Sequence, residues 1–184
     1  MHMFVSLLRG INVTGYHMVS MPRLRELYES LRLEGVRTYI QSGNVVFGSA
    51  RDDPEFLKAE IERAIERTFG FDVPVVLRRA AELRKVIRAN PFLGRDGVDE
   101  GRLYVTFLER APSKALVNAL APVTVKSKDD YEVLGKEIYL HCPHGYGKTL
   151  LSTTFFEKHL KIEATNRNWK TVQTLLAMVD SSPT

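Results

Sequence analysis

The spacing of apolar residues over the first 80 positions predicts a series of short elements. Met3 to Arg9 is an apolar run with β-branched and aromatic members, which indicates a strand. Apolar residues recur at helical spacing from Met21 to Leu31, with Ser20 in place to cap this helix and Gly35 to stop it. The chain therefore opens with a strand followed by a helix.

A hairpin and a second helix extend this pattern. Residues 36–40 and 45–47 are expected strands, and the turn between them is short enough to require antiparallel pairing. Residues 54–70 have one apolar face and predict a second helix, and residues 73–77 predict a further strand. The order βαββαβ is that of a ferredoxin-like unit, with both helices on one face of the sheet.

A basic helix, Ala80 to Ala89, ends at Asn90-Pro91 and marks a boundary. The pattern then restarts, because the strand Leu103 to Glu109 resembles Met3 to Arg9 position by position. The order of elements repeats as well, which favours an internal duplication over a chance likeness of two apolar strands.

The second half is expected to depart from the first toward its end. A helix capped near Ser113 and a hairpin within residues 131–142 follow its first strand. A helix from about Lys148 and a last helix carrying Trp169 then close the chain. The predicted fold is α+β, with a ferredoxin-like half at 1–90 and, at 91–184, a related βαββ unit with two C-terminal helices, packed as one body.

Composition agrees with such a fold. The 184 residues are 44% hydrophobic and 26% charged, which is typical of a globular chain of one domain or two small ones. No uncharged stretch approaches the length of a membrane span, roughly 20 residues. The start of the chain lacks a basic region before its apolar run and an A-x-A-like cleavage site, so no signal peptide is expected. With Cys142 as its single cysteine, the protein is expected to be cytoplasmic and not associated with membranes.

Two segments in the first half carry polar residues that folding alone does not require. In LLRGINV, Asn12 follows Arg9 on the other side of Gly10. Arg9 offers a planar fork of donors to a carboxylate or phosphate, or it bonds the carbonyl groups of the loop. In YIQSGNVVF, Asn44 suits a tight turn, whereas Gln41 and Ser42 either bind a ligand or cap that turn.

Two further segments lie in the second half. In PHGYGKT, Lys148 and Thr149 follow two glycines as in a phosphate-binding loop, but the first glycine of the full pattern is missing. Two interpretations remain open: a generic anion-binding site, or a simple turn with Thr149 as a helix cap. In TNRNWKTV, Arg167 and Asn168 come where a helix is expected to begin, Asn168 as its cap.

The chemistry of these segments favours holding a ligand over moving protons. Neither LLRGINV, YIQSGNVVF nor TNRNWKTV contains an Asp or Glu, and His141, Cys142 and His144 are too close together for a zinc site, so no metal is expected. The net charge of +4 is spread along the chain, and it permits anion or nucleic-acid binding without requiring either.

These motifs together resemble a bacterial family catalogued as domain of unknown function 1697. The likeness runs from LLRGINV and TYIQSGNVVF through NPF, VTFL, GYGKT and FFEK to RNW, in that order. It implies an α+β fold of two ferredoxin-like halves and no established activity. Leu150, Ser20 and Asn166 depart from the family's usual Lys, Lys and Thr, so the site hypothesis is based on Arg9, Lys148 and Arg167.

Three hypotheses follow. The first is a small-molecule site between the halves that binds a phosphate or carboxylate ligand, with or without catalysis; the catalytic residues and any cofactor are unknown. Its expected ligand-binding residues are Arg9, Asn12, Gln41, Ser42, Asn44, Lys148, Thr149, Arg167 and Asn168. The second is a structural or protein-interaction module in which these residues hold the halves together.

The third hypothesis, nucleic-acid binding, is disfavoured. Ser42 and Asn44 occupy the two positions where an RNA-recognition fold places stacking aromatic residues. A basic stripe including Arg78, Arg79 and Arg84 keeps non-specific binding open, although such a run is usually a solvated helix face.

Overall fold

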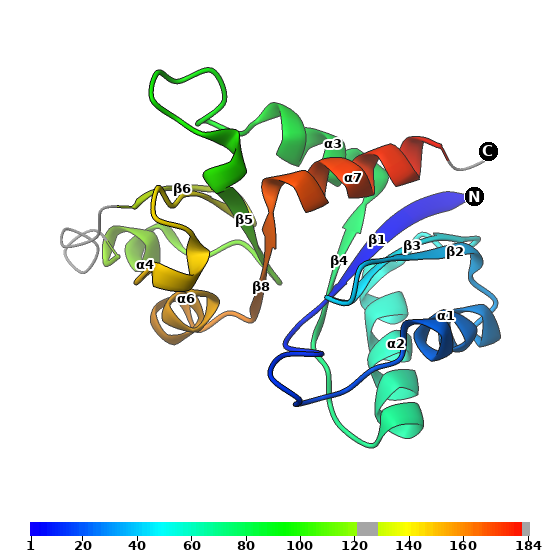
Figure 1. Ribbon diagram of the computed structural model, residues 1–184. Helices are drawn as coiled ribbons and strands as arrows, with labels where there is room; N and C mark the ends of the chain where they lie inside the picture. The colour runs from blue at the N-terminus through cyan, green and yellow to red at the C-terminus, as the bar shows by residue number, and fades with distance from the viewer. Residues whose placement is uncertain (121–128, 182–184) are drawn as a thin grey trace. The chain divides into compact units, whose positions relative to one another are not determined.

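A computed structural model describes residues 1–120 and 129–181, and it confirms the α+β fold class. Its strands form two four-stranded antiparallel sheets, each with flanking helices (Figure 1). The chain divides into two compact units, one of residues 1–85 with the segment from residue 174 onward and one of residues 86–173. That the halves pack as one body stays a prediction.

The first unit has the predicted βαββαβ order. Its elements are β1 (His2–Leu8), α1 (Met21–Ser30), β2 (Glu34–Tyr39), β3 (Asn44–Ser49), α2 (Pro54–Phe69) and β4 (Val75–Arg79). The strands lie in the order β2-β3-β1-β4, so the first and third strands are central and antiparallel, as in a ferredoxin-like sheet. The basic helix α3 (Ala80–Arg88) follows, with residues in both units.

Apolar side chains from one face of this sheet form the core of the first unit with α1 and α2. Phe4 and Phe47 are directly opposite on β1 and β3, and Tyr28 of α1 packs edge-on to Phe47. The hydroxyl groups of Tyr28 and Ser6 are hydrogen-bonded at 2.7 Å. This bond satisfies both polar groups inside the core. Burial raises the pKa of Tyr28 and keeps this phenol neutral.

Two predicted caps of this unit have different outcomes. The Asp53 carboxylate accepts a hydrogen bond from the N–H of Phe56 at 3.0 Å and caps α2, and Gly70 ends that helix in the left-handed conformation. Ser20 occupies the N-cap position of α1, but its hydroxyl makes no capping hydrogen bond.

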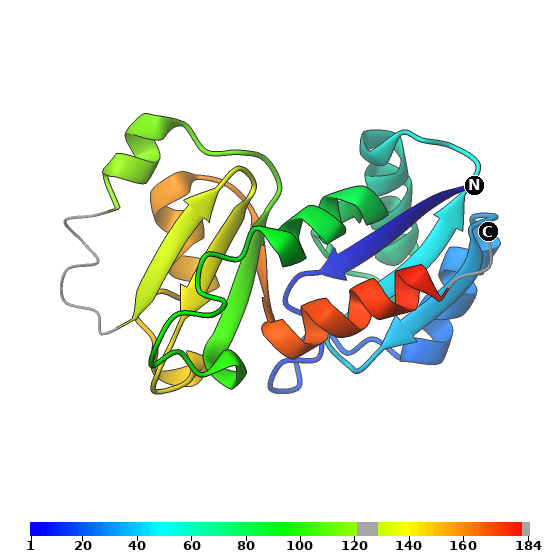
Figure 2. The same cartoon turned by 90° about the horizontal axis from the view of Figure 1, so that it is seen from above.

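The second unit repeats the same topology. Its elements are a 3₁₀ turn η1 (Glu100–Arg102), β5 (Leu103–Leu108), α4 (Lys114–Asn118), β6 (Asp130–Leu134), β7 (Glu137–His141), a 3₁₀ turn η2 (Tyr146–Lys148), α6 (Thr153–Leu160) and β8 (Ala164–Asn168). The strand order β6-β7-β5-β8 matches that of the first sheet strand for strand, and the four strands can be followed in Figure 2. The final helix α7 (Trp169–Asp180) has residues in both units.

Two sequence predictions for this unit are wrong. The chain forms a strand, β8, between the last two helices, so the second half is a full βαββαβ unit and not a βαββ unit. The helix expected from about Lys148 is α6, which begins at Thr153 and is capped by the Ser152 hydroxyl. Ser113 caps α4 as predicted, through a hydrogen bond from the N–H of Leu116 at 3.3 Å.

The core of the second unit lies between its sheet and the helices α4 and α6. Leu108, Leu140 and Phe156 are fully buried there, together with the Cys142 side chain. Within residues 1–120 and 129–181, no helix has both the length and the apolar character needed to cross a membrane.

Candidate functional site

Asn12 connects the loop after β1 to the turn between β2 and β3. Its side-chain oxygen accepts a hydrogen bond from the N–H of Val19 at 2.8 Å. Its amide nitrogen donates to the carbonyl oxygens of Val19 at 3.0 Å and Gln41 at 2.9 Å. All three bonds go to backbone groups, so the Asn12 amide holds two loops together.

Asn44 and Ser42 stabilise the turn itself. The Asn44 amide is buried and donates to the carbonyl oxygen of Tyr39 at 3.0 Å and to the Ser42 hydroxyl at 2.9 Å. The carbonyl of the intervening Gly43 accepts a hydrogen bond from the N–H of Leu8 at 2.8 Å. These contacts support a structural role for Ser42 and Asn44, which is the alternative that the sequence left open.

Arg9 and Gln41 lie beside these residues. Arg9 is half-buried, and its backbone N–H donates to the carbonyl of Pro74 at 2.9 Å. The Gln41 side chain is exposed, and its carbonyl is the group that Asn12 binds. The structure thus brings together all five predicted residues of the first unit, which are Arg9, Asn12, Gln41, Ser42 and Asn44.

The backbone of this region is strained. Asn12, Thr14, His17 and Ile40 have φ angles of 55°, 47°, 48° and 48°. These values lie in the left-handed region that non-glycine residues rarely adopt, and Thr14 and Ile40 are the least expected there because both are β-branched. Each such residue costs roughly 1–3 kcal/mol, and strain of this kind concentrates at functional sites.

In the second unit, residues 143–149 form a closed turn, the glycine turn. The N–H groups of Gly145, Lys148 and Thr149 donate to the carbonyls of residues 142, 145 and 146 at 2.8, 3.1 and 3.2 Å. These backbone donors are therefore used inside the turn, whereas a phosphate-binding loop directs such donors at its anion. Any anion bound here would have to be held mainly by side chains.

Thr149 does not cap a helix. Its hydroxyl donates to the carboxylate of Asp129 at 2.5 Å and accepts from the N–H of Leu151 at 2.9 Å. The Cys142 thiol is buried close by, and burial together with the negative charge of Asp129 raises its pKa to about 11. Thr149 thus anchors the turn to Asp129, a carboxylate that the sequence motifs gave no reason to expect here.

Arg102 is a cation of this turn that the motifs did not indicate. Its carbonyl accepts a hydrogen bond from the N–H of Cys142 at 2.9 Å, which places η1 beside the turn. Its guanidinium lies against Gly145, since a Cβ atom built on this glycine would be 3.1 Å from the nearer terminal nitrogen of Arg102. Lys148, whose side chain is exposed, belongs to the same turn.

Arg167 and Asn168 are neighbours on β8 whose side chains face opposite sides of the sheet. Arg167 is only 7% exposed and donates to the Thr165 hydroxyl at 2.8 Å and the Asn166 carbonyl at 2.7 Å. Burial lowers the pKa of Arg167 to about 10. Asn168 lies opposite Tyr104 in the sheet.

The side-chain oxygen of Asn168 accepts a hydrogen bond from the N–H of Thr171 at 2.8 Å. This bond confirms the predicted cap. Tyr104 in turn contacts Tyr146 of the turn, with ring centroids 5.2 Å apart. Asn168 therefore lies on the same face of the sheet as the glycine turn, whereas Arg167 faces the other side. The four predicted residues of the second unit, Lys148, Thr149, Arg167 and Asn168, do not all face one place.

The basic stripe considered for nucleic-acid binding is not one solvated helix face. Arg78 lies on β4 and is 1% exposed. Arg79 pairs with Asp52 at 2.8 Å. This contact holds the pKa of Asp52 below its ordinary value. Arg84 pairs with Asp180 at 2.6 Å.

The side chains of the described segments do not assemble a metal site. Nowhere in residues 1–120 or 129–181 do three His, Cys, Asp or Glu side chains gather closely enough to hold a metal ion. His141 is buried at the end of β7, and the carboxylate of Asp130 lies 4.0 Å from it.

Comparisons with known proteins address the fold and family. The family model for "Protein of unknown function (DUF1697)" matches residues 1–139. Among solved structures, the conserved bacterial protein SP0830 from Streptococcus pneumoniae is similar, with a TM-score of 0.68 and 23% identity over 97% of this chain and 98% of that one. No curated protein matches the chain. At this identity the structural likeness concerns the fold alone.

Proposed function

The chain belongs to the DUF1697 family of proteins of unknown function, and from this premise we propose that it binds a small anionic ligand, a phosphate or a carboxylate. The proposed seat is the glycine turn of the second unit, with Arg102 and Lys148 as the cations. Of the residues expected from the sequence, Lys148 is retained as a ligand contact, and Asn168 lies on the same face of the sheet.

One observation supports this proposal above the others. Gly145 has φ and ψ angles of 86° and 151°. This conformation is open only to glycine, and the missing side chain leaves room for the Arg102 guanidinium. The carboxylate paired with that guanidinium is Asp99, at 3.9 Å and on an exposed side chain. Such a pair is weak, so Arg102 is available to take a second, bidentate partner.

Lys148 adds a second positive charge to the turn. Among the residues that the structure describes, its ammonium has no hydrogen-bond or ion-pair partner. The Asp129 carboxylate beside the turn accepts a hydrogen bond from the Thr149 hydroxyl, and no ion pair joins it to Lys148. Two cations beside a tight turn suit an oxyanion with several acceptor oxygens better than a neutral ligand.

Titration with inorganic phosphate, followed through the backbone amide NMR signals, tests the proposal. We expect the signals of Gly145 and Gly147 to shift with saturation, and Arg102→Met or Lys148→Met to weaken binding by about tenfold. Lys158→Met, which removes an exposed cation from α6, serves as the matched control. Unchanged shifts in the wild type, or an equal loss in the control, would contradict the proposal.

A second candidate, a protein-interaction module, is favoured by the apolar exposure of the strained loop. Val13, Tyr16 and Met18 are 55%, 75% and 65% exposed. Ile40, beside the Gln41 carbonyl that Asn12 binds, is 51% exposed. Large apolar side chains that cluster on a surface are typical of interaction sites.

Self-association is the simplest form of this second candidate. Sedimentation velocity should then show a concentration-dependent increase in mass, and Tyr16→Ser combined with Met18→Ser should remove it. A monomer at every concentration would exclude self-association through this loop.

A further inference from the structure

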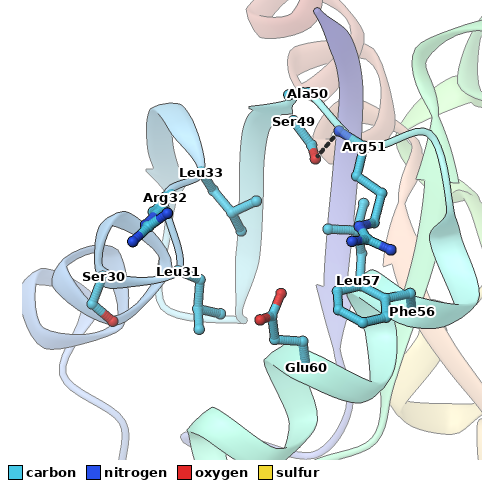
Figure 3. A pocket seen from close by; sticks show the side chains of 10 residues that line it. All are labelled: Ser30, Leu31, Arg32, Leu33, Ser49, Ala50, Arg51, Phe56, Leu57 and Glu60. Carbon is cyan, nitrogen blue, oxygen red and sulfur yellow. Dashed lines mark hydrogen bonds between the residues drawn. The ribbon is translucent and has the colours of Figure 1, made fainter.

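A pocket of about 410 Å³ opens in the first unit, away from the motif residues (Figure 3). It lies where α1 ends, β3 ends and α2 begins. A volume of this size is within the range of small-molecule sites, roughly 300–1,000 Å³. The pocket is independent of the proposed anion seat, which belongs to the second unit.

Part of the pocket wall is apolar, beside the serine, arginine and glutamate side chains that also line it. Leu33 and Leu57 are buried members of the core, and Leu31 at the end of α1 packs against them. These side chains are fixed by the packing of the first unit. They provide a rigid apolar surface against which the aliphatic group of a small ligand can pack.

Arg51 supplies a positively charged group that is held in place. Its guanidinium lies 3.9 Å from the ring centroid of Phe56. This contact restricts the orientation of both groups. The backbone N–H of Arg51 donates to the Ser49 hydroxyl at 3.0 Å and fixes the segment that leads into α2. Figure 3 shows this guanidinium and ring together at one side of the pocket.

Arg32 contributes a second positive charge from a strained position. It follows the C-cap of α1 and has a φ of 60°. Helices usually carry glycine at such a position. The N–H of Leu33 reaches back to the carbonyl of Tyr28 at 3.4 Å, as in a Schellman motif. An arginine here costs more than glycine would, and such costs are more common where the side chain has a function.

Glu60 places a negative charge in the same pocket. It is half-buried on α2, and Figure 3 shows its carboxylate pointing into the space between Leu31 and Leu57. Within the described part of the chain, neither this carboxylate nor the Arg32 guanidinium forms a hydrogen bond or ion pair. Such a carboxylate can form a charge-assisted hydrogen bond with a cationic group of a ligand.

From this arrangement we propose that the pocket binds a small zwitterion, an α-amino acid with an apolar side chain. The ligand carboxylate would pair with Arg51, because guanidinium groups match carboxylates in a bidentate manner. The ligand ammonium would pair with Glu60, and the apolar side chain would contact Leu31, Leu33 and Leu57.

Isothermal titration with L-leucine, L-methionine and L-phenylalanine tests this proposal. We expect at least one of them to bind, and the matching N-acetyl amino acid and amino-acid amide, which each lack one charge, to bind about tenfold more weakly. No heat of binding for any of the three at about 10 mM ligand would overturn the proposal. Equal binding of the N-acetyl derivative would overturn the role of Glu60.

Substitutions locate the ligand. Glu60→Gln and Arg51→Met should each weaken binding of the amino acid by about tenfold. Glu66→Gln and Arg67→Met, which change exposed charges farther along α2, are the matched controls and should leave binding unchanged. Equal losses in all four variants would show that net charge and not this pocket determines binding. Because phosphate binding is measured at the other unit, its failure and the failure of this proposal are distinguishable.

Discussion

The Asn12 side-chain amide donates to the Gln41 carbonyl oxygen across 2.9 Å. This bond joins LLRGINV to YIQSGNVVF, two motifs that are far apart in the sequence. The same side chain forms two hydrogen bonds with the backbone of Val19: its nitrogen donates to the Val19 carbonyl, and its oxygen accepts from the Val19 N–H. A residue expected to contact a ligand is thus bonded to the protein through both of its polar atoms. This observation gives the alternative of a structural role direct support for Asn12.

Replacing Asn12 by alanine should lower the free energy of unfolding by roughly 2–4 kcal/mol. Three hydrogen bonds worth about 0.5–1.5 kcal/mol each are lost, and the backbone groups of Val19 and Gln41 lose a partner. Chemical denaturation measures the change. Gln41→Ala is the matched control, since its carbonyl and not its side chain binds Asn12. It should change stability by less than about 0.5 kcal/mol. Equal effects of the two substitutions would contradict the structural role.

Gly43→Ala should destabilise the first unit more than Gly70→Ala. Both glycines have positive φ angles, 70° and 83°. Each substitution therefore introduces backbone strain of roughly 1–2 kcal/mol. Only at Gly43 would the new Cβ lie 2.6 Å from the Leu8 Cβ and 2.8 Å from the Ile11 Cδ1, whereas Gly70 faces open space. Overpacking adds a further cost of roughly 1–3 kcal/mol. Thermal unfolding of the two variants side by side tests the difference, and equal midpoints would exclude the clash.

The strands and helices of the first unit were predictable because their apolar spacing is regular. The strand β8 was missed for a physical reason: its sequence, Ala-Thr-Asn-Arg-Asn, has no apolar alternation, and it is held by backbone pairing to β5. The pairing is long-range, since Tyr104 lies opposite Asn168. The spacing of apolar residues within one segment cannot predict a pairing with a distant strand.

The candidate site was predictable in its location more than in its chemistry. The first-unit motifs do meet, because the end of β1 and the start of β3 are neighbours in the antiparallel sheet. Which polar groups are already bonded to backbone could not be inferred from residue type. Arg102 was missed because it reaches Gly145 only through the pairing of β5 with β7, far from it in the sequence.

Replacing Arg32 by glycine should stabilise the protein by roughly 0.5–1 kcal/mol, although most substitutions destabilise. Glycine adopts the left-handed conformation at the end of α1 without the steric cost that the Cβ of arginine brings. Arg25→Gly, in the right-handed interior of the same helix, should instead cost about 1 kcal/mol. Loss of stability on Arg32→Gly would show that this side chain makes a stabilising contact.

The Cys142 thiol should make stability fall as the pH rises from about 9 to about 11. Its pKa is raised to about 11 in the folded protein, first by burial and then by the charge of Asp129, against 9.0 for an ordinary thiol. Between these values the unfolded chain gives up the thiol proton while the folded protein keeps it, so the unfolded state gains roughly 2 kcal/mol by about pH 11. The stabilising term is fully present below the unfolded pKa and is lost as the pH rises toward the folded value. Denaturation of the wild type and Cys142→Ala across this range isolates the term, because the alanine variant lacks it while other titrating groups are shared. Parallel pH profiles for the two proteins would mean that the thiol ionises alike in both states.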